Sequence, residues 1–208
     1  MAIGLQHTPN SKPAPGLKLS YQEFLEAQFD HDHYEWVDGE VIEMAAVEEE
    51  NNRLAFFVAR LLADYVDARD GGDVFLEPFQ MHLAGHPASG RAPDVQVVLK
   101  KNAARVTRLY TDGPADLVVE VTSAGSRTTD RRDKFREYRD GGVPEYWILD
   151  PLRKRAEFFV LEQGAYVPGD IDDDDRYRSR VLPGVWFDLD WFWTRPPKTD
   201  VLKLWGVL

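Results

Sequence analysis

The chain has 208 residues, no cysteine and a formal net charge of −11. A chain of this length can bury one hydrophobic core without disulfide bonds, and the lack of cysteine excludes thiol catalysis and cysteine-bound zinc. The acidic balance argues against unspecific coating of nucleic acid, which depends on Lys and Arg. Residues 84–155 are nevertheless basic, with 14 Lys and Arg against 10 Asp and Glu.

No stretch of the chain is typical of a targeting or membrane segment. Residues 1–16 are rich in Pro, Ser and Asn, and we expect them to be a disordered tail ahead of a single domain over residues 17–208. The tail has neither a basic leader nor an apolar run of signal-peptide length. No later stretch approaches ~18 uninterrupted apolar residues. We therefore expect a soluble cytoplasmic protein that does not bind membranes.

The expected elements begin with a hairpin between two helices. Ser20 and Glu23 form a capping box, which signals the start of a helix. Asp38-Gly39 supplies positive φ for a two-residue hairpin turn. From Glu49 to Gly71-Gly72, apolar residues recur at three- and four-residue steps, which is typical of one helical face. We expect a helix over 21–28, strands over 34–37 and 40–44, and a helix over 49–68 whose buried face carries Leu54, Phe57, Val58, Leu61, Leu62, Tyr65 and Val66.

Five β-rich, mostly apolar segments follow, interrupted by one helix. We expect strands over 74–83, 94–99, 116–122, 146–149 and 156–161, and a helix over 129–140 that Gly141-Gly142 closes. A strand, a helix and a strand in succession form a crossover unit, which requires the two strands to lie parallel. Closing strands or a short helix are expected over 177–182, 185–189 and 191–193. The predicted fold class is α/β with a mixed sheet.

Two carboxylates occupy unusual places in these strands. Asp94 follows Pro93, and because proline marks the first residue of a strand, Asp94 lies at the end of the sheet. Glu120 lies in the apolar run D-L-V-V-E-V, where a carboxylate is costly unless it is paired or metal-bound. The alternative for Glu120 is an ion pair with Arg127 or Arg131. Two carboxylates at the ends of adjacent strands would suit Mg²⁺ or Mn²⁺.

Lys134 lies on the buried face of the helix that follows Glu120. Helical spacing places positions 131, 134, 135 and 138 on this face, which Phe135 and Tyr138 identify as buried. The spacing directs Arg132, Asp133, Arg136 and Glu137 largely elsewhere. In a purely structural role, Lys134 extends its ammonium to solvent or pairs with Asp130. In a functional role, the ammonium lies near a metal-bound water and stabilises charge on a phosphate.

Three ordered motifs resemble the Uma-two family of proposed endonucleases within the PD-(D/E)XK superfamily: A-P-D-V-Q-V-V-L, D-L-V-V-E-V-T-S and D-R-R-D-K-F-R-E-Y-R-D-G-G-V-P-E-Y-W-I-L-D-P. The similarity extends to Y-E-W-V-D-G-E-V-I-E-M near the start and R-S-R-V-L-P-G-V near the end, so it covers roughly residues 34–192. It implies a restriction-endonuclease-like mixed sheet flanked by helices, with an N-terminal hairpin and a long helix.

The resemblance also implies roles for individual residues. Asp94 and Glu120 would hold Mg²⁺ or Mn²⁺, helped by the backbone carbonyl of Val121, and Lys134 would assist. This chain departs from the superfamily pattern at Thr122, where the lysine usually stands two residues after the second acid. It departs again at Asn51, because relatives tend to carry a histidine near the start of the long helix.

Other residues are weaker candidates. Glu40 could reach a metal ion through water, although a hairpin acid without a catalytic task is favoured. His31 and His33 lack the third ligand that a zinc site needs. His82 and His86 could touch substrate, with a plain loop role as the default. Core or covering roles, not base stacking, are expected for Trp147, Trp191 and Trp193.

The preferred hypothesis is a Mg²⁺- or Mn²⁺-dependent endonuclease that hydrolyses DNA phosphodiester bonds. The first alternative hypothesis is a module that kept the nuclease fold, lost the activity and binds DNA or protein. Asn51 and the overall acidity favour this alternative. The second is a metal-dependent hydrolase of another substrate, since fold does not determine function. A cut through both DNA strands would suggest a homodimer.

Overall fold

The computed structural model describes residues 11–14, 16–31, 33–85, 88–123 and 130–208, and the side chains of residues 130 and 131 are not described. The expected N-terminal tail lies mostly outside the described residues, although Ser11 forms a β-bridge with Phe29. Within the described residues, no helix is both long and apolar enough to span a membrane.

Helices and runs of consecutive strands follow one another along the chain. The helices are α1 (Tyr21–Glu26), α2 (Glu49–Asp67), η1 (Lys100–Arg105), η2 (Asp130–Lys134), α4 (Phe135–Gly141), α5 (Trp191–Thr194) and α6 (Lys198–Leu204). The strands are β1 (Tyr34–Val37), β2 (Glu40–Glu43), β3 (Gly72–Leu76), β4 (Gln80–Leu83), β5 (Ser89–Arg91), β6 (Val95–Leu99), β7 (Tyr110–Asp112), β8 (Leu117–Val121), β9 (Glu145–Asp150), β10 (Arg155–Glu162), β11 (Ala165–Pro168), β12 (Arg176–Arg178) and β13 (Trp186–Asp188).

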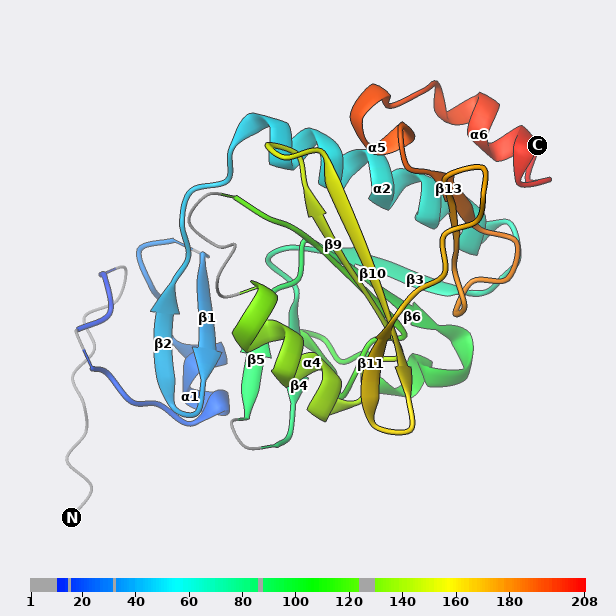
Figure 1. The fold of residues 1–208 in the computed structure, drawn as a ribbon. Coiled ribbons are helices and arrows are strands. Elements are labelled where there is room, and N and C mark those ends of the chain that lie inside the picture. The colour runs from blue at the N-terminus through cyan, green and yellow to red at the C-terminus, as the bar shows by residue number, and fades with distance from the viewer. Residues whose placement is uncertain (1–10, 15, 32, 86–87, 124–129) are drawn as a thin grey trace, which may run out of the picture.

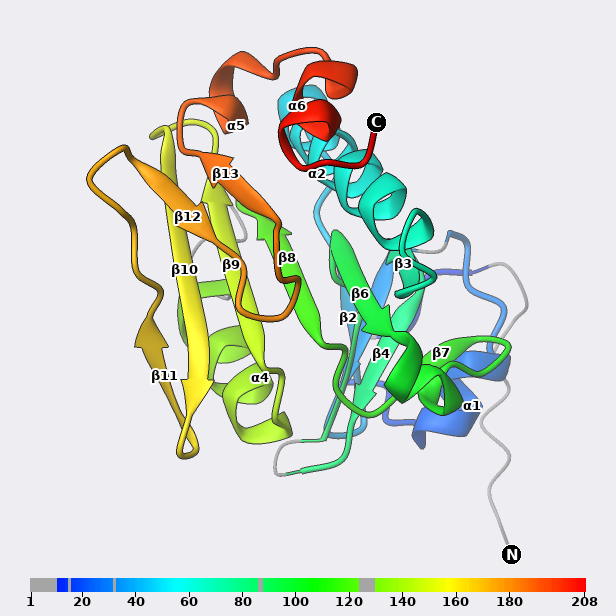
Figure 2. The same ribbon diagram turned by 90° about the vertical axis from the view of Figure 1, so that its right-hand side faces the viewer.

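A six-stranded sheet in the order β11-β10-β9-β8-β6-β3 is the centre of the molecule. Strands β8 and β9 pair in parallel, as the crossover through η2 and α4 requires. The other neighbours in the sheet pair antiparallel. Figures 1 and 2 show α2, α5 and α6 on one face of this sheet and α4 on the other. The predicted mixed α/β sheet flanked by helices is therefore confirmed.

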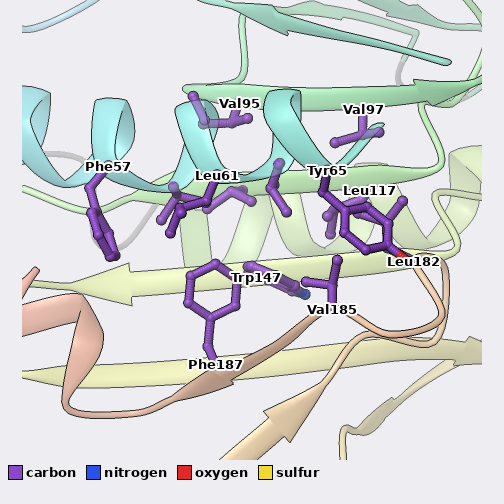
Figure 3. Close-up of a cluster of buried hydrophobic side chains, with 14 of the residues drawn as sticks. Phe57, Leu61, Tyr65, Val95, Val97, Leu117, Trp147, Leu182, Val185 and Phe187 are labelled. Carbon is purple, nitrogen blue, oxygen red and sulfur yellow. The ribbon is translucent and has the colours of Figure 1, made fainter. Parts of the chain in front are cut away.

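The larger hydrophobic core lies between α2 and the six-stranded sheet. Trp147 of β9 is completely buried at its centre, and Figure 3 shows Phe57, Leu61 and Tyr65 reaching down from α2 toward it. All seven residues expected on the apolar face of α2 are buried. Trp191 and Trp193 pack against the same core, so the expected covering roles of these tryptophans are confirmed.

Glu145 of β9 anchors the C-terminal segment to this core. Its side chain is fully buried, and its two oxygens accept hydrogen bonds from Trp147 Nε1, Tyr177 OH, Ser179 Oγ and the backbone N–H groups of residues 180 and 181, at 2.7 to 3.0 Å. Five donors meet the hydrogen-bonding demand of a buried carboxylate. The glutamate of P-E-Y-W therefore has a structural task away from the site described below.

The N-terminal hairpin belongs to a second sheet in the order β2-β1-β5-β4-β7. Asp38 and Gly39 both have positive φ, 48° and 92°, as the two-residue turn between β1 and β2 requires. The single strand expected over residues 74–83 is wrong. Pro78, which has no N–H to donate, separates β3 from β4, and the two strands belong to different sheets.

The second sheet and the six-stranded sheet meet around α4. Met81 and Leu83 of β4 pack in one cluster with Tyr138 of α4 and with side chains of β6, β8 and β9. The approach is close: a Cβ atom at Gly141 would lie 2.6 Å from Leu83 Cδ1. One side of α4 therefore packs against both sheets, and Glu137 and Tyr138 on that side are buried.

Candidate active site

Asp94 and Glu120 are neighbours across adjacent strands. Val95 of β6 is the register partner of Val119 of β8, so one further step along this antiparallel pair brings Asp94 opposite Glu120. Directly opposed residues project to the same face of a sheet. The backbone N–H of Val121 donates a 2.7 Å hydrogen bond to Asp94 Oδ2, which holds the first carboxylate against the end of β8.

Both carboxylates line a cavity of about 60 Å³ where the linker before α2 crosses the ends of β6 and β8. Its lining residues are Met44, Ala45, Ala46, Val47, Asn51, Glu77, Ala92, Asp94, Glu120, Val121, Ser123 and Lys134. An open groove of about 860 Å³ lies alongside and shares Asp94, Glu77 and three linker residues with it. A group bound at Asp94 is therefore accessible from the groove.

Lys134 lies between two carboxylates and is buried, with 1% of its surface exposed. Its Nζ atom lies 2.9 Å from Glu120 Oε2 and 3.4 Å from Glu35 Oε1. This burial rules out the alternative in which the ammonium extends to solvent. The alternative partner Asp130, and the alternative partners of Glu120, Arg127 and Arg131, have side chains outside the described residues.

The other oxygen of Glu120 is bound by Tyr138, whose hydroxyl donates to Oε1 at 2.6 Å. Burial, with the nearby negative charge of Glu120, raises the pKa of Tyr138 well above its usual value. The phenol therefore stays protonated and donates to the carboxylate at all ordinary pH values. Lys134 and Tyr138 come from consecutive turns of the same helical segment, so η2 and α4 together set the orientation of Glu120.

A buried ion network that the sequence patterns do not predict extends from Lys134 into the second sheet. Arg91 of β5 donates to Glu35 Oε2 at 2.7 Å and binds both oxygens of Glu137 at 2.7 and 2.8 Å. Helical spacing directs Glu137 largely elsewhere than the face of Phe135 and Tyr138, but Glu137 is buried all the same, because the second sheet covers this side of α4 and supplies Arg91.

Glu35 remains ionised inside this network. Its oxygens also accept the backbone N–H of Ala92 at 3.1 Å. Burial alone would raise the pKa of Glu35, but the positive charges of Lys134 and Arg91 outweigh burial and hold it below the usual value. The signal for Glu35 in the sequence is weak: an acid between Tyr34 and Trp36 also fits a strand with one wet face.

Asn51 and Val121 complete the wall of the small cavity. Asn51, in the first turn of α2, donates from Nδ2 to the carbonyl oxygen of Val121 at 3.1 Å. That carbonyl keeps a second lone pair. Thr122, which stands where the superfamily pattern has a lysine, is fully buried.

The weaker candidates lie elsewhere or remain untested. Glu40 is exposed on β2, 3.3 Å from Lys18. His31 and His33 line the larger groove, where His33 Nδ1 lies 3.2 Å from Glu77 Oε1. His82 stacks on Tyr21, with ring centroids 4.2 Å apart, and His86 is outside the described residues. Among the described side chains, no three His, Asp or Glu residues converge as a metal site.

The donor set fits a hard divalent cation that protein and water hold together. Asp94, Glu120, Val121 and Asn51 line one cavity, and carboxylate, carbonyl and amide oxygens are the ligands that Mg²⁺ and Mn²⁺ take. Both Glu120 oxygens already accept a hydrogen bond, but a carboxylate offers about four lone-pair sites. Among the described side chains of the cavity and its ion network, five acids outnumber two bases by three negative charges: Asp94, Glu35, Glu77, Glu120 and Glu137 against Arg91 and Lys134.

The structure thus combines a mixed sheet flanked by helices with two acids on adjacent strands and a buried lysine beside them. A crystal structure described as a putative nuclease belonging to DUF820, from Anabaena variabilis, superimposes with a TM-score of 0.70 over 85% of this chain and 98% of that one, at 14% identity. The family model described as Uma2, putative restriction endonuclease, matches residues 21–190. The chain therefore belongs to the Uma2 family. An uncharacterized protein of Synechocystis is 27% identical over 126 residues, 60% of this chain and 70% of that protein.

Proposed function

We propose that this protein is an endonuclease that hydrolyses DNA phosphodiester bonds with Mg²⁺ or Mn²⁺. One observation carries the proposal: Asp94 and Glu120 stand opposite each other on adjacent strands, and Lys134 Nζ lies 2.9 Å from Glu120 in the same cavity. Membership of a family of putative restriction endonucleases supports it. The basic balance of residues 84–155, which contain all three residues, agrees with a polyanionic substrate.

Asp94, Glu120 and the carbonyl of Val121 would hold the metal ion. When bound, such an ion acidifies a coordinated water and neutralises charge on the scissile phosphate. The chain's own contribution is orientation. The Val121 N–H holds Asp94, and Tyr138 and Lys134 hold the two oxygens of Glu120.

Lys134 would stabilise negative charge that develops on the phosphate. An ammonium in a water-poor site is effective in this role because its charge is little screened there. Glu35 gives Lys134 a second anionic neighbour besides Glu120. The lysine would therefore keep its place when the oxygens of Glu120 turn to a metal ion.

The larger groove is the proposed path of the DNA strand. It reaches Asp94 and carries His31 and His33, whose ring N–H groups can donate to phosphate oxygens. A cut through both strands would need a second site, for which a homodimer is the simplest source. The dimer stays a prediction.

A plasmid-cleavage assay tests the proposed function. The parent protein is expected to nick or linearise supercoiled DNA with Mg²⁺ or Mn²⁺ and to stop with EDTA, whereas Asp94→Asn is expected to be inactive. Glu40→Gln is the matched control, because Glu40 is an exposed acid paired with Lys18 on the hairpin, and it should cut like the parent. Equal cleavage by the parent and Asp94→Asn would refute the assignment.

A further inference from the structure

The side-chain amide of Asn51 has a hydrogen-bond partner on its nitrogen and none among the described residues on its oxygen. Asn51 is buried, with 5% of its surface exposed. Its partner, the carbonyl oxygen of Val121, can only accept, so the amide nitrogen must face it. The oxygen Oδ1 must then face the other way. Among the residues that the structure describes, no donor reaches this buried oxygen.

The unpartnered oxygen belongs to a residue in the wall of the small cavity. Asp94, Glu120 and Lys134 line that cavity with it, and the volume of about 60 Å³ exceeds the roughly 10–15 Å³ that one ordered water needs. A buried polar atom without a partner is costly and points to a missing donor. The donor that fits here is therefore small, polar and close to the two carboxylates.

We propose that Asn51 Oδ1 accepts a hydrogen bond from a water molecule in the hydration shell of the divalent cation at Asp94 and Glu120. Mg²⁺ keeps several waters when one or two carboxylates bind it, and these waters are strong donors that need acceptors. Asn51 would then act twice on the same ion, by placing the Val121 carbonyl through Nδ2 and by orienting a water through Oδ1. This inference rests on the metal site of the proposed function.

Asn51 in place of the histidine of relatives is interpreted differently in this role. The departure from the histidine of relatives favours the alternative without activity, whereas the contacts show a residue that donates to Val121 and holds a buried acceptor oxygen without a described partner. The hydrogen bond from Asn51 to Val121 joins the start of α2 to the end of β8. Asn51 is a positioning residue here, because it would act on the ion through Val121 and through water.

Calorimetric titration of Mn²⁺ into the full-length protein without DNA tests this role. Asn51→Leu removes both the donor and the acceptor and is expected to weaken Mn²⁺ binding by ~10-fold or more, as the loss of outer hydrogen-bonding partners does at other metal sites. Asn51→Asp keeps an acceptor oxygen but loses the Nδ2 donor, so it is expected to weaken Mn²⁺ binding less than Asn51→Leu does. Asn52→Leu is the matched control, because Asn52 is exposed and lines the larger groove.

The outcomes separate this inference from the proposed function. Parent-like Mn²⁺ affinity in Asn51→Leu overturns the role of Asn51 and leaves the metal site intact. Equal weakening in Asn51→Asp and Asn51→Leu also overturns the role of Oδ1, because the bond from Nδ2 would then account for the whole effect. If the parent does not bind Mn²⁺, the proposed function itself fails. Thermal denaturation of each variant establishes that it is folded.

Discussion

The Nζ atom of Lys134 lies 3.4 Å from Oε1 of Glu35, a residue 99 positions earlier on a strand of the other sheet. The same ammonium lies 2.9 Å from Glu120. Because the lysine comes from a helix and not from the strand that carries Glu120, its position depends on how that helix is packed. Glu35 and Arg91 supply that packing from the second sheet, so the N-terminal hairpin takes part in the proposed site.

Replacing Lys134 by Met should separate catalysis from metal binding. The variant keeps the length of the side chain and loses its charge, so we expect DNA cleavage at saturating Mn²⁺ to fall by ~100-fold or more. Mn²⁺ affinity should not decrease, because the change removes a positive charge beside the carboxylates. Single-turnover cleavage and calorimetry measure the two effects. Parent-like cleavage by a folded Lys134→Met protein would exclude a role for the ammonium.

Glu35 and Glu137 form a matched pair for testing the network. Both bind Arg91, but within the described contacts Glu35 alone also approaches Lys134. Removing one partner of a buried ion pair costs about 3–5 kcal/mol, so we expect both Glu→Gln variants to lower the free energy of unfolding. Cleavage per folded molecule should fall further in Glu35→Gln. Equal rates in the two variants would show that Glu35 acts on stability alone.

The ionisation of Glu35 predicts a loss of stability in acid. Its pKa in the folded protein is below the usual value of 4.5, so its contribution is fully present above about pH 4.5 and is lost as the pH falls through the lower folded value. Thermal midpoints measured between about pH 6 and pH 3 should therefore fall less steeply in Glu35→Gln than in the parent. Identical slopes would contradict the lowered pKa.

Two adjacent glycines after α2 should respond differently to alanine. Gly72 has φ of +146°, and a Cβ atom there would lie 2.2 Å from the carbonyl oxygen of Val98. A Cβ atom at Gly71 would lie 3.4 Å from its nearest neighbour, the carbonyl oxygen of Val66. We expect Gly72→Ala to lower the free energy of unfolding by more than ~2 kcal/mol and Gly71→Ala to change it by less than ~1 kcal/mol. Urea unfolding measures both, and equal effects would contradict this geometry.

Sequence patterns predicted those parts of the fold in which one local signal dominates. The apolar period of α2, the Asp38-Gly39 turn and the crossover from β8 to β9 each follow from such a signal, and each is confirmed. Asp94, Glu120 and Lys134 could likewise be selected before their geometry was known, because a charged residue in an apolar setting is conspicuous. Their catalytic roles stay proposals.

The second sheet and its ion network could not be predicted in the same way. Strands β5 and β7 have three residues each, which is too short to show a period. Arg91 is 56 residues from Glu35 and 46 from Glu137, and each alone is typical of a solvated surface. These charges are buried because two sheets meet around α4. Such tertiary packing leaves no local pattern in the sequence.

Anomalous diffraction from crystals soaked in Mn²⁺ tests the central claim most directly. We expect a single strong peak in the small cavity, within about 2.0–2.3 Å of oxygen atoms of Asp94 and Glu120. Asp94→Asn crystals soaked in the same solution should lose this peak. A parent crystal with Mn²⁺ bound elsewhere, or with none at these two carboxylates, would contradict the proposed metal site and the endonuclease mechanism built on it.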